Sequence, residues 1–135
     1  MSIVAIRAAL ETQLAAINPS IATAWENDEF TPPALSVPYQ AVNLLPAQPG
    51  NDESGQAYTQ QGILLVSLRY PVKAGSADAA ARAELIQTAF ARGTSFVTGN
   101  INIIIDRTPE IAPGRVDEDR FVLPVRIRFF AQVGA

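Results

Sequence analysis

Carboxylates are the side chains of this sequence with the widest chemical range. Among 13 aspartates and glutamates, two pairs lie close together in the chain: Glu26 with Asp28, and Asp106 with Glu110. A carboxylic acid and a carboxylate that face each other across a cleft can divide general acid and base work between them, as in a hydrolase. Pairs this close arise by chance among so many acids, and spacing alone does not build a cleft. We therefore expect neither pair to be catalytic.

Acidic residues also cluster in two polar segments, as Asp52 and Glu53 and as Asp117, Glu118 and Asp119. Clustered carboxylates suggest calcium as an alternative ligand. A calcium-binding loop alternates its oxygen ligands around a central glycine, whereas the second cluster is continuous and is flanked by Arg115 and Arg120. We interpret both clusters as parts of solvated loops and predict no metal site.

Two residue types that carry much of enzyme chemistry are absent, since the sequence has no cysteine and no histidine. Disulfides, thiolate nucleophiles, the commonest general base near neutral pH and the commonest nitrogen ligand are thereby excluded. Gly75 and Ser76 precede a predicted helix, but the segment KAGSAD lacks the spacing of a phosphate-binding loop, so we interpret them as a turn and a helix cap. We predict that the protein is not an enzyme and binds no cofactor.

Length and charge point to one soluble domain. The chain has 135 residues, 48% of them hydrophobic, which predicts a single domain over residues 1–135. The net charge of −3 and the single lysine give no overall positive field, so no nucleic acid contact is required. The start MSIVAIRAALETQL resembles no secretory signal, and no apolar run is long enough to span a membrane. We expect an intracellular protein without membrane contact.

The first half of the chain predicts one helix and two extended segments. Apolar residues at steps of three and four predict an amphipathic helix that ends before Pro19: Ile3, Ile6, Leu10, Leu14 and Ile17. Extended segments are expected at 21–25 and 38–45, on either side of an irregular passage with several prolines. Trp25 and Phe30 are interpreted as packing aromatics. Residues 47–56, AQPGNDESGQ, predict a mobile loop.

The second half predicts a long strand, a helix, a hairpin and a final strand. Residues 58–70 alternate between an apolar and a more polar face, and the helix after Ser76 carries the apolar stripe Ala79, Ala83, Ile86 and Phe90. Strands at 95–98 and 101–106 are joined by Gly99 and Asn100, which suit a tight turn. A second polar loop is expected at 107–120, before a strand at 121–133 in which Pro124 indicates an edge position or a bulge.

This order of elements predicts an α+β fold, with a mainly antiparallel β-sheet and two α-helices packed on one face. The opposite face then carries Arg69, Arg126 and Arg128 together with Ile63, Leu65 and Phe130. Two interpretations remain open for that face: a solvated surface with cross-strand ion pairs, or an interface for an acidic partner.

A short amino-terminal helix followed by two stretches of the sequence resembles the tail terminator proteins of long-tailed phages, the group that includes the terminator of phage lambda. The two stretches are AWENDEFTPPALSVPYQAVNLLP and, after a polar loop, YTQQGILLVSLRYPVKAGSADAAARAELIQTAF, which resembles the family's strand, glycine-containing turn and second helix. The resemblance implies a small α+β subunit that closes into a ring, commonly a hexamer, on the completed tail tube. Such a ring stops tube polymerisation and presents a surface to the head's connector protein.

The sequence therefore predicts a virion assembly protein of the head-proximal tail end, assembled in the host cytoplasm, whose partners are itself, the tail tube protein and the connector. The alternatives are another neck or head-tail joining protein, a small-ligand-binding α+β domain, or a carboxylate-dependent hydrolase. The loops at 47–57 and 107–120 are interpreted either as segments that order on assembly or as passive surface. Interface residues are predicted on these loops and on the arginine-bearing face: Asp52, Glu53, Arg69, Arg115, Asp117, Glu118, Asp119, Arg126, Arg128 and Phe130.

Overall fold

The structure, a computed structural model, describes residues 2–51 and 57–134. Within these ranges it contains two helices and eight strands: α1 (Ser2–Ala15), β1 (Ala22–Ala24), β2 (Tyr39–Pro46), β3 (Tyr58–Pro71), α2 (Ala77–Ala89), β4 (Ser95–Thr98), β5 (Ile101–Ile105), β6 (Glu110–Ile111), β7 (Arg115–Asp117) and β8 (Arg120–Val133). The strand order is β1-β2-β3-β8-β5-β4, and only the β1–β2 pair of this sheet is parallel. The predicted α+β class is confirmed. Asp52 and Glu53 lie outside the described residues.

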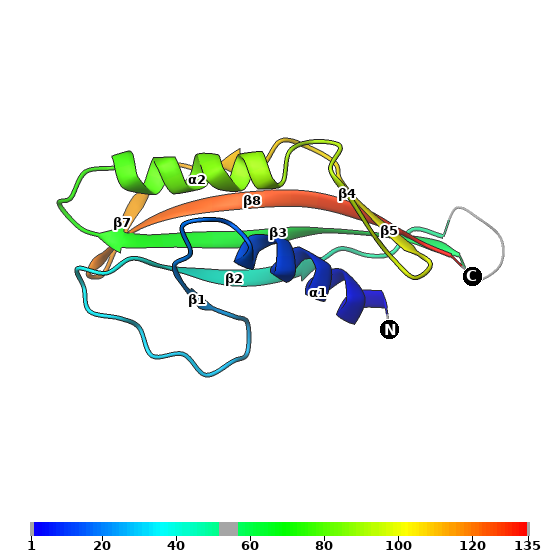
Figure 1. The fold of residues 1–135 in the computed structure, drawn as a ribbon, viewed down its shortest axis with the longest axis horizontal. Helices are drawn as coiled ribbons and strands as arrows, with labels where there is room; N and C mark the ends of the chain where they lie inside the picture. Colours follow the sequence, from blue (N-terminus) through cyan, green and yellow to red (C-terminus); the bar gives the residue numbers. More distant parts are fainter. Residues whose placement is uncertain (1, 52–56, 135) are drawn as a thin grey trace.

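The two longest strands, β3 and β8, form the centre of the sheet (Figure 1). They pair antiparallel along their whole lengths, from Tyr58 opposite Val133 to Pro71 opposite Arg120. On its other side β8 pairs with β7, β6 and β5 in turn. Because alternate residues of paired strands point to the same face, the register of this central pair decides which side chains meet on each face.

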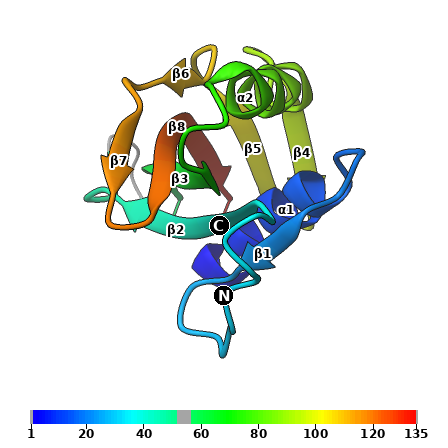
Figure 2. The same ribbon diagram turned by 90° about the vertical axis from the view of Figure 1, so that its left-hand side faces the viewer.

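One face of the sheet, here called the inner face, packs against both helices, as the sequence predicts. Figure 2 looks along the long strands and shows α1 and α2 on the same side of β3 and β8. The most fully buried side chains come from the helices and the strands alike: Ile6, Leu10, Leu14, Leu64, Leu68, Ile86, Phe90 and Ile127. Full burial of one such side chain contributes about 1.5–3 kcal/mol, so this cluster is the main source of stability. The opposite, helix-free side is called the outer face.

The second polar loop, expected at 107–120, is only partly a loop. It contains β6 and β7, which both pair with β8 and place Ile111 opposite Val125 and Arg115 opposite Val122. The two strands are two and three residues long and are separated by proline and glycine, so they leave no periodic pattern in the sequence. Their pairing covers the half of β8 that β5 does not reach.

Pro124 was expected at a sheet edge or a bulge, and the edge interpretation is wrong because β8 lies between β3 and the other strands. The pairing is irregular at this point, however. Between β6 and β7, the three residues 112–114 lie opposite only two residues of β8, 123 and 124. The carbonyl of Pro124 accepts a hydrogen bond from the backbone N–H of Ala112 at 2.9 Å. In an antiparallel strand the nitrogen and the carbonyl of one residue face the same neighbouring strand. The nitrogen of Pro124, which has no hydrogen to donate, therefore faces the gap between β6 and β7, where no strand pairing is lost.

The helices match their expected positions, but one predicted cap is not formed. The side chain of Ser76 makes no capping hydrogen bond, and only its carbonyl is used, accepting from Ala80 N–H at 2.9 Å. The hairpin prediction holds, because Gly99 takes a φ of 59° between β4 and β5. Neither helix in the described part of the chain has the length and apolar character needed to cross a membrane.

Candidate protein-interaction surface

The outer face of β2, β3 and β8 carries apolar side chains that no helix covers. The register places Leu45 opposite Ile63, and Ile63 opposite Arg128, while Phe130 is opposite Gln61. These side chains line a cavity of about 520 Å³ with Asp106 at its side, here called the outer-face groove. Leu45 is 49% exposed, one of several large apolar side chains that the fold leaves on its surface.

Arginines gather along one side of this groove. Arg126 and Arg128 are two residues apart on β8, so they share the outer face, and they line a further hollow of about 380 Å³ together with Arg107. A neighbouring hollow is lined by Arg92, Arg107, Thr108 and Asp106. Together Arg92, Arg107, Arg126 and Arg128 are named the arginine cluster. It holds four of the ten basic residues of a chain with net charge −3.

Two members of the arginine cluster, Arg92 and Arg107, were not predicted from the sequence. Arg92 follows α2 and Arg107 follows β5, and these two element ends meet beside β8. These two residues could have been found from the pairing of the 101–106 strand with the final strand, because that pairing brings Arg107 next to Arg126 and Arg128. That pairing cannot be derived from hydrophobic periodicity, which reports the faces of a strand and not its neighbours.

The other predicted interface residues form a second group at the opposite end of β3. Arg69 is opposite Val122, and its guanidinium lies 3.7 Å from the carboxylate of Asp117, which is also 3.8 Å from Arg115. Glu118 and Asp119 occupy the turn between β7 and β8, where Glu118 has a φ of 57°. Arg69 and Leu65, the residue opposite Arg126, are four positions apart on β3, which is about 13 Å. The outer-face arginines thus form two groups and not one patch.

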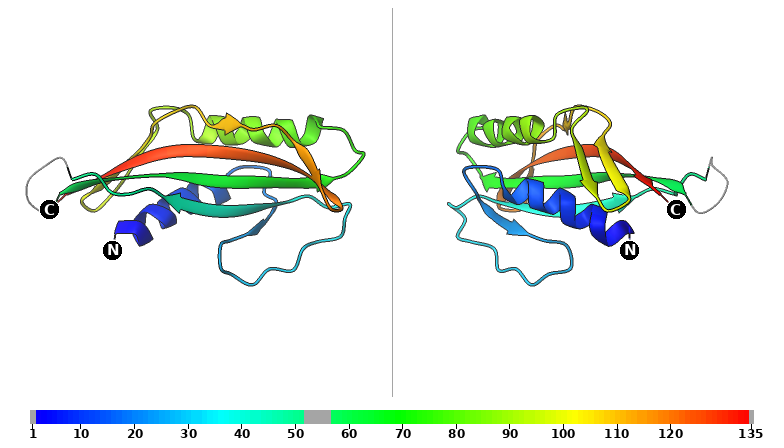
Figure 3. Two further views of the ribbon diagram at one scale, coloured as in Figure 1. Left: turned by 180° about the vertical axis from the view of Figure 1, so that it is seen from behind. Right: turned by 45° about the vertical axis from the view of Figure 1, so that its right-hand side comes forward.

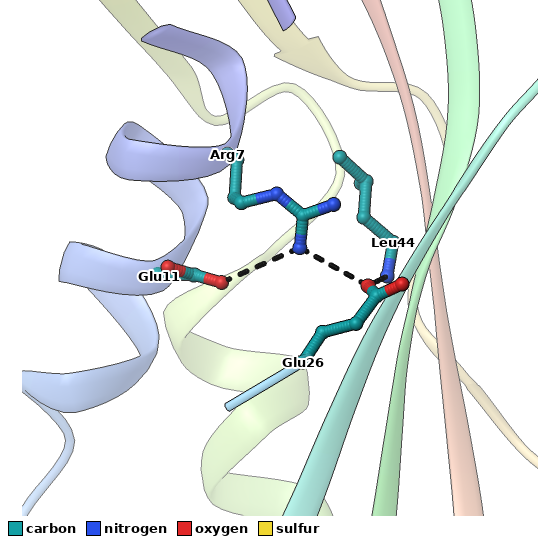
Figure 4. A network of polar contacts seen from close by, with 4 residues as sticks. All are labelled: Arg7, Glu11, Glu26 and Leu44. Carbon is teal, nitrogen blue, oxygen red and sulfur yellow. Dashed lines mark hydrogen bonds and ion pairs between the residues drawn. The ribbon is translucent and has the colours of Figure 1, made fainter. Parts of the chain in front are cut away.

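The paired carboxylates considered for catalysis do not face each other in a shared cleft. Glu26 accepts hydrogen bonds from the backbone N–H of Leu44 at 2.8 Å and from Arg7 at 3.0 Å, and Arg7 also lies 3.7 Å from Glu11 (Figure 4). The Leu44 N–H first, and Arg7 second, lower the pKa of Glu26, so this carboxylate stays ionised. It is an anchor between α1 and β2 and not a proton donor.

The two carboxylates of the second pair, Asp106 and Glu110, differ in their contacts. Glu110 lies 3.3 Å from Arg126 across β6 and β8. The backbone N–H of Asp106 donates to the carbonyl of Arg128 at 3.1 Å, and its exposed side chain borders the outer-face groove. In the described ranges no three acidic side chains come together in a way that would hold a metal ion.

Comparison with known proteins identifies the family. The sequence model of the family described as phage tail terminator protein matches residues 5–129. The chain belongs to this phage tail terminator family. Seven chains of solved structures match, and one of them is 23% identical, with a TM-score of 0.74, over 96% of this chain and 95% of that chain. That likeness shows the fold alone, and no curated protein matches the sequence.

Membership in the tail terminator family confirms the resemblance seen in the sequence. It assigns the chain a structural or assembly role in the phage tail, with a location in the virion tail and contacts to other tail or head components. The family is one of structural tail proteins and not a known enzyme family.

Proposed function

We propose that this chain forms a homo-oligomeric ring, a hexamer, that caps the completed tail tube at its head-proximal end. The ring stops further polymerisation of the tube protein and offers its other side to the head-tail connector. The observation that carries this proposal is the family match over residues 5–129. The outer-face groove supports it, because a tail protein that works alone has no need of an uncovered apolar surface.

A closed ring needs two different surfaces on each subunit, with the first surface of one copy meeting the second surface of the next. The residues predicted for such contacts lie in two separate groups on the outer face, around Arg126, Arg128 and Phe130 and around Arg69 and Asp117. Residues 107–120 already pair with β8 in the single chain, so we do not propose that they order on assembly. Part of the 47–57 loop is also paired, since Gly50 exchanges two backbone hydrogen bonds with Thr59.

The proposal is tested by imaging the purified protein alone and with tail tubes. Negative-stain micrographs are expected to show rings with a central hole whose number rises with protein concentration, and a ring at one end only of each tube. Tubes grown from tube protein should stop lengthening when the ring protein is added. Decoration along the whole tube, or a strict monomer in every mixture, would contradict the proposal. Rings that bind purified connectors but not tubes would favour another head-tail joining role.

A further inference from the structure

The loop between β1 and β2, residues 27–38, stands away from the rest of the molecule. Figure 1 and both views of Figure 3 show it projecting from the edge of the sheet beside β1. Leu35 and Val37 are 54% and 45% exposed on this loop. It also carries two exposed acids, Asp28 and Glu29, and no basic residue. A projecting segment that is both apolar and acidic is suited to enter a basic, apolar cavity on a partner.

A buried arginine holds this loop in place. Arg120 is 4% exposed, and its guanidinium donates to the carbonyls of Val37 at 2.6 Å, Pro33 at 2.8 Å and Ala34 at 3.0 Å. The same guanidinium lies 4.8 Å from the centre of the Tyr39 ring. Three backbone carbonyls are therefore fixed to the end of β8 before any partner arrives. A segment that is ordered in advance loses less conformational entropy on binding.

The surface that fits this loop is the outer-face groove with its arginine cluster. In the described part of the chain, Arg92, Arg107 and Arg128 have no carboxylate within ion-pair distance, and only Arg126 has one, from Glu110. Four arginines thus face two carboxylates, Asp106 and Glu110, beside an apolar cavity, which leaves a net positive charge there on a chain whose net charge is −3. The two surfaces are complementary both in charge and in apolar character.

Building on the ring function proposed above, we infer that the β1–β2 loop of one subunit inserts into the outer-face groove of the next. Leu35 and Val37 enter the apolar part of the groove. Asp28 and Glu29 face the arginine cluster. The occupant of the groove is therefore a second copy of this chain, and every subunit supplies one loop and one groove.

A subunit cannot place Leu35 and Val37 in its own groove. These residues lead into Tyr39, and the groove begins at Leu45, six residues and about 20 Å further along β2, although the first residues of the loop lie nearer to Leu45, because Glu26 accepts a hydrogen bond from the Leu44 N–H. Arg120 holds the loop at its end of the sheet. The contact must then join two different patches on two copies, which is the type of contact that generates rings.

Charge reversal tests the contact directly. One variant reverses the loop, with Asp28→Lys and Glu29→Lys, and a second reverses the groove, with Arg107→Glu and Arg128→Glu. Each variant alone sets like charges against each other, so the protein concentration at which half of it forms rings should rise by about ten-fold or more. Ring formation is measured by light scattering after size exclusion and by negative-stain imaging, with and without tail tubes.

Rescue separates a true partner contact from general damage. In an equal mixture of the two variants, loops and grooves of opposite charge meet again in a ring that alternates the two, and assembly should return. A single chain with all four substitutions should also assemble. Glu84→Lys, an exposed charge reversal on α2 and so on the opposite face of the sheet from the groove, should form rings like the unmodified protein. Thermal melts of every variant report whether the fold is kept.

The outcomes distinguish this contact from the function on which it rests. Rings of normal stability from either reversed variant, or two failing variants that do not rescue each other, would overturn the contact and leave the ring function standing. Failure of the unmodified protein to form rings under any condition would overturn both. Binding of DNA that the groove reversal abolishes, with ring formation unchanged, would assign the arginine cluster to nucleic acid instead.

Discussion

The two faces of β3 differ sharply although they share one backbone. The inner face carries three fully buried side chains, Leu64, Val66 and Leu68. The outer face carries the alternating neighbours Ile63 and Leu65, which are only half-buried. The inner face is closed by the two helices of the same chain. The outer face has no such cover. Alternate residues of one strand thus face a covered core and an uncovered surface, so the effect of a substitution on stability should change sharply from one residue to the next.

Arginine shows the same division between the faces. Arg82 on α2 is 4% exposed and donates a hydrogen bond to the backbone carbonyl of Pro19. Burial lowers the pKa of Arg82, and burial also raises the pKa of Tyr70 nearby, because desolvation disfavours each charged form. Arg128 on the outer face is exposed and has no ion pair among the described residues. A buried arginine fixes the fold, and an exposed unpaired one is available to a partner.

The largest expected effect comes from truncating neighbouring leucines on the two faces. Leu64→Ala removes a fully buried side chain and should lower the free energy of unfolding by about 2–5 kcal/mol. Leu65→Ala, the same change one residue along, should lower it by only about 1 kcal/mol. Urea unfolding of dilute protein measures both values. Equal losses would show that the outer face contributes to the fold as much as the inner face does.

A glycine on the inner face offers a finer test of how tightly that face is packed. A Cβ at Gly62 would lie 2.8 Å from Cζ of Phe129 and 3.0 Å from the carbonyl oxygen of Leu45. Gly62→Ala should therefore cost about 1–3 kcal/mol through overpacking. Adding Phe129→Leu should restore part of the loss, because the smaller side chain gives way. A neutral Gly62→Ala would indicate that the inner face can shift to make room.

The smallest expected effect concerns Glu26 and depends on pH. Its pKa is lowered from the ordinary value of 4.5, so the ionised carboxylate stabilises the fold above that pH, and the contribution is lost as the pH falls through the lower folded-state value. Glu26→Gln should cost about 1 kcal/mol at pH 7, a modest figure because the side chain is 34% exposed. The difference from the unmodified protein should shrink below pH 4.5. Glu84→Gln, an exposed acid on α2, provides the control, and an equal pH dependence there would contradict this account.

The sequence was sufficient for the elements with a strong period and insufficient for those without one. Both helices, β3, β8 and the hairpin follow from apolar spacing and turn residues. The strands β6 and β7 do not, because two or three residues show no period. The burial of Arg82 was also missed, since an arginine in a helix is normally a surface residue and its partner, the Pro19 carbonyl, is 63 positions away.

The candidate surface was predicted in part and for a clear reason. Alternation along the strands placed Arg126, Arg128 and Phe130 on the helix-free face. Alternation does not give the register between strands. In the observed register Arg69 lies away from these residues and forms an ion pair with Asp117. The role proposed for residues 27–38 depends on Arg120, whose three acceptors lie 83 to 87 positions away in the chain. Contacts of such long range appear only once the chain is folded.

The carboxylate of Glu26 also has a consequence for aggregation. Beyond the short β1, the side of β2 is open, and a strand from another molecule would need backbone donors there to attach. The N–H of Leu44 is already occupied by Glu26, and Pro46, which faces the same side two residues later, has no N–H to offer. This stretch of β2 therefore offers an incoming strand no backbone donor at either position, which makes it a poor site for the strand-on-strand addition that builds cross-β fibrils.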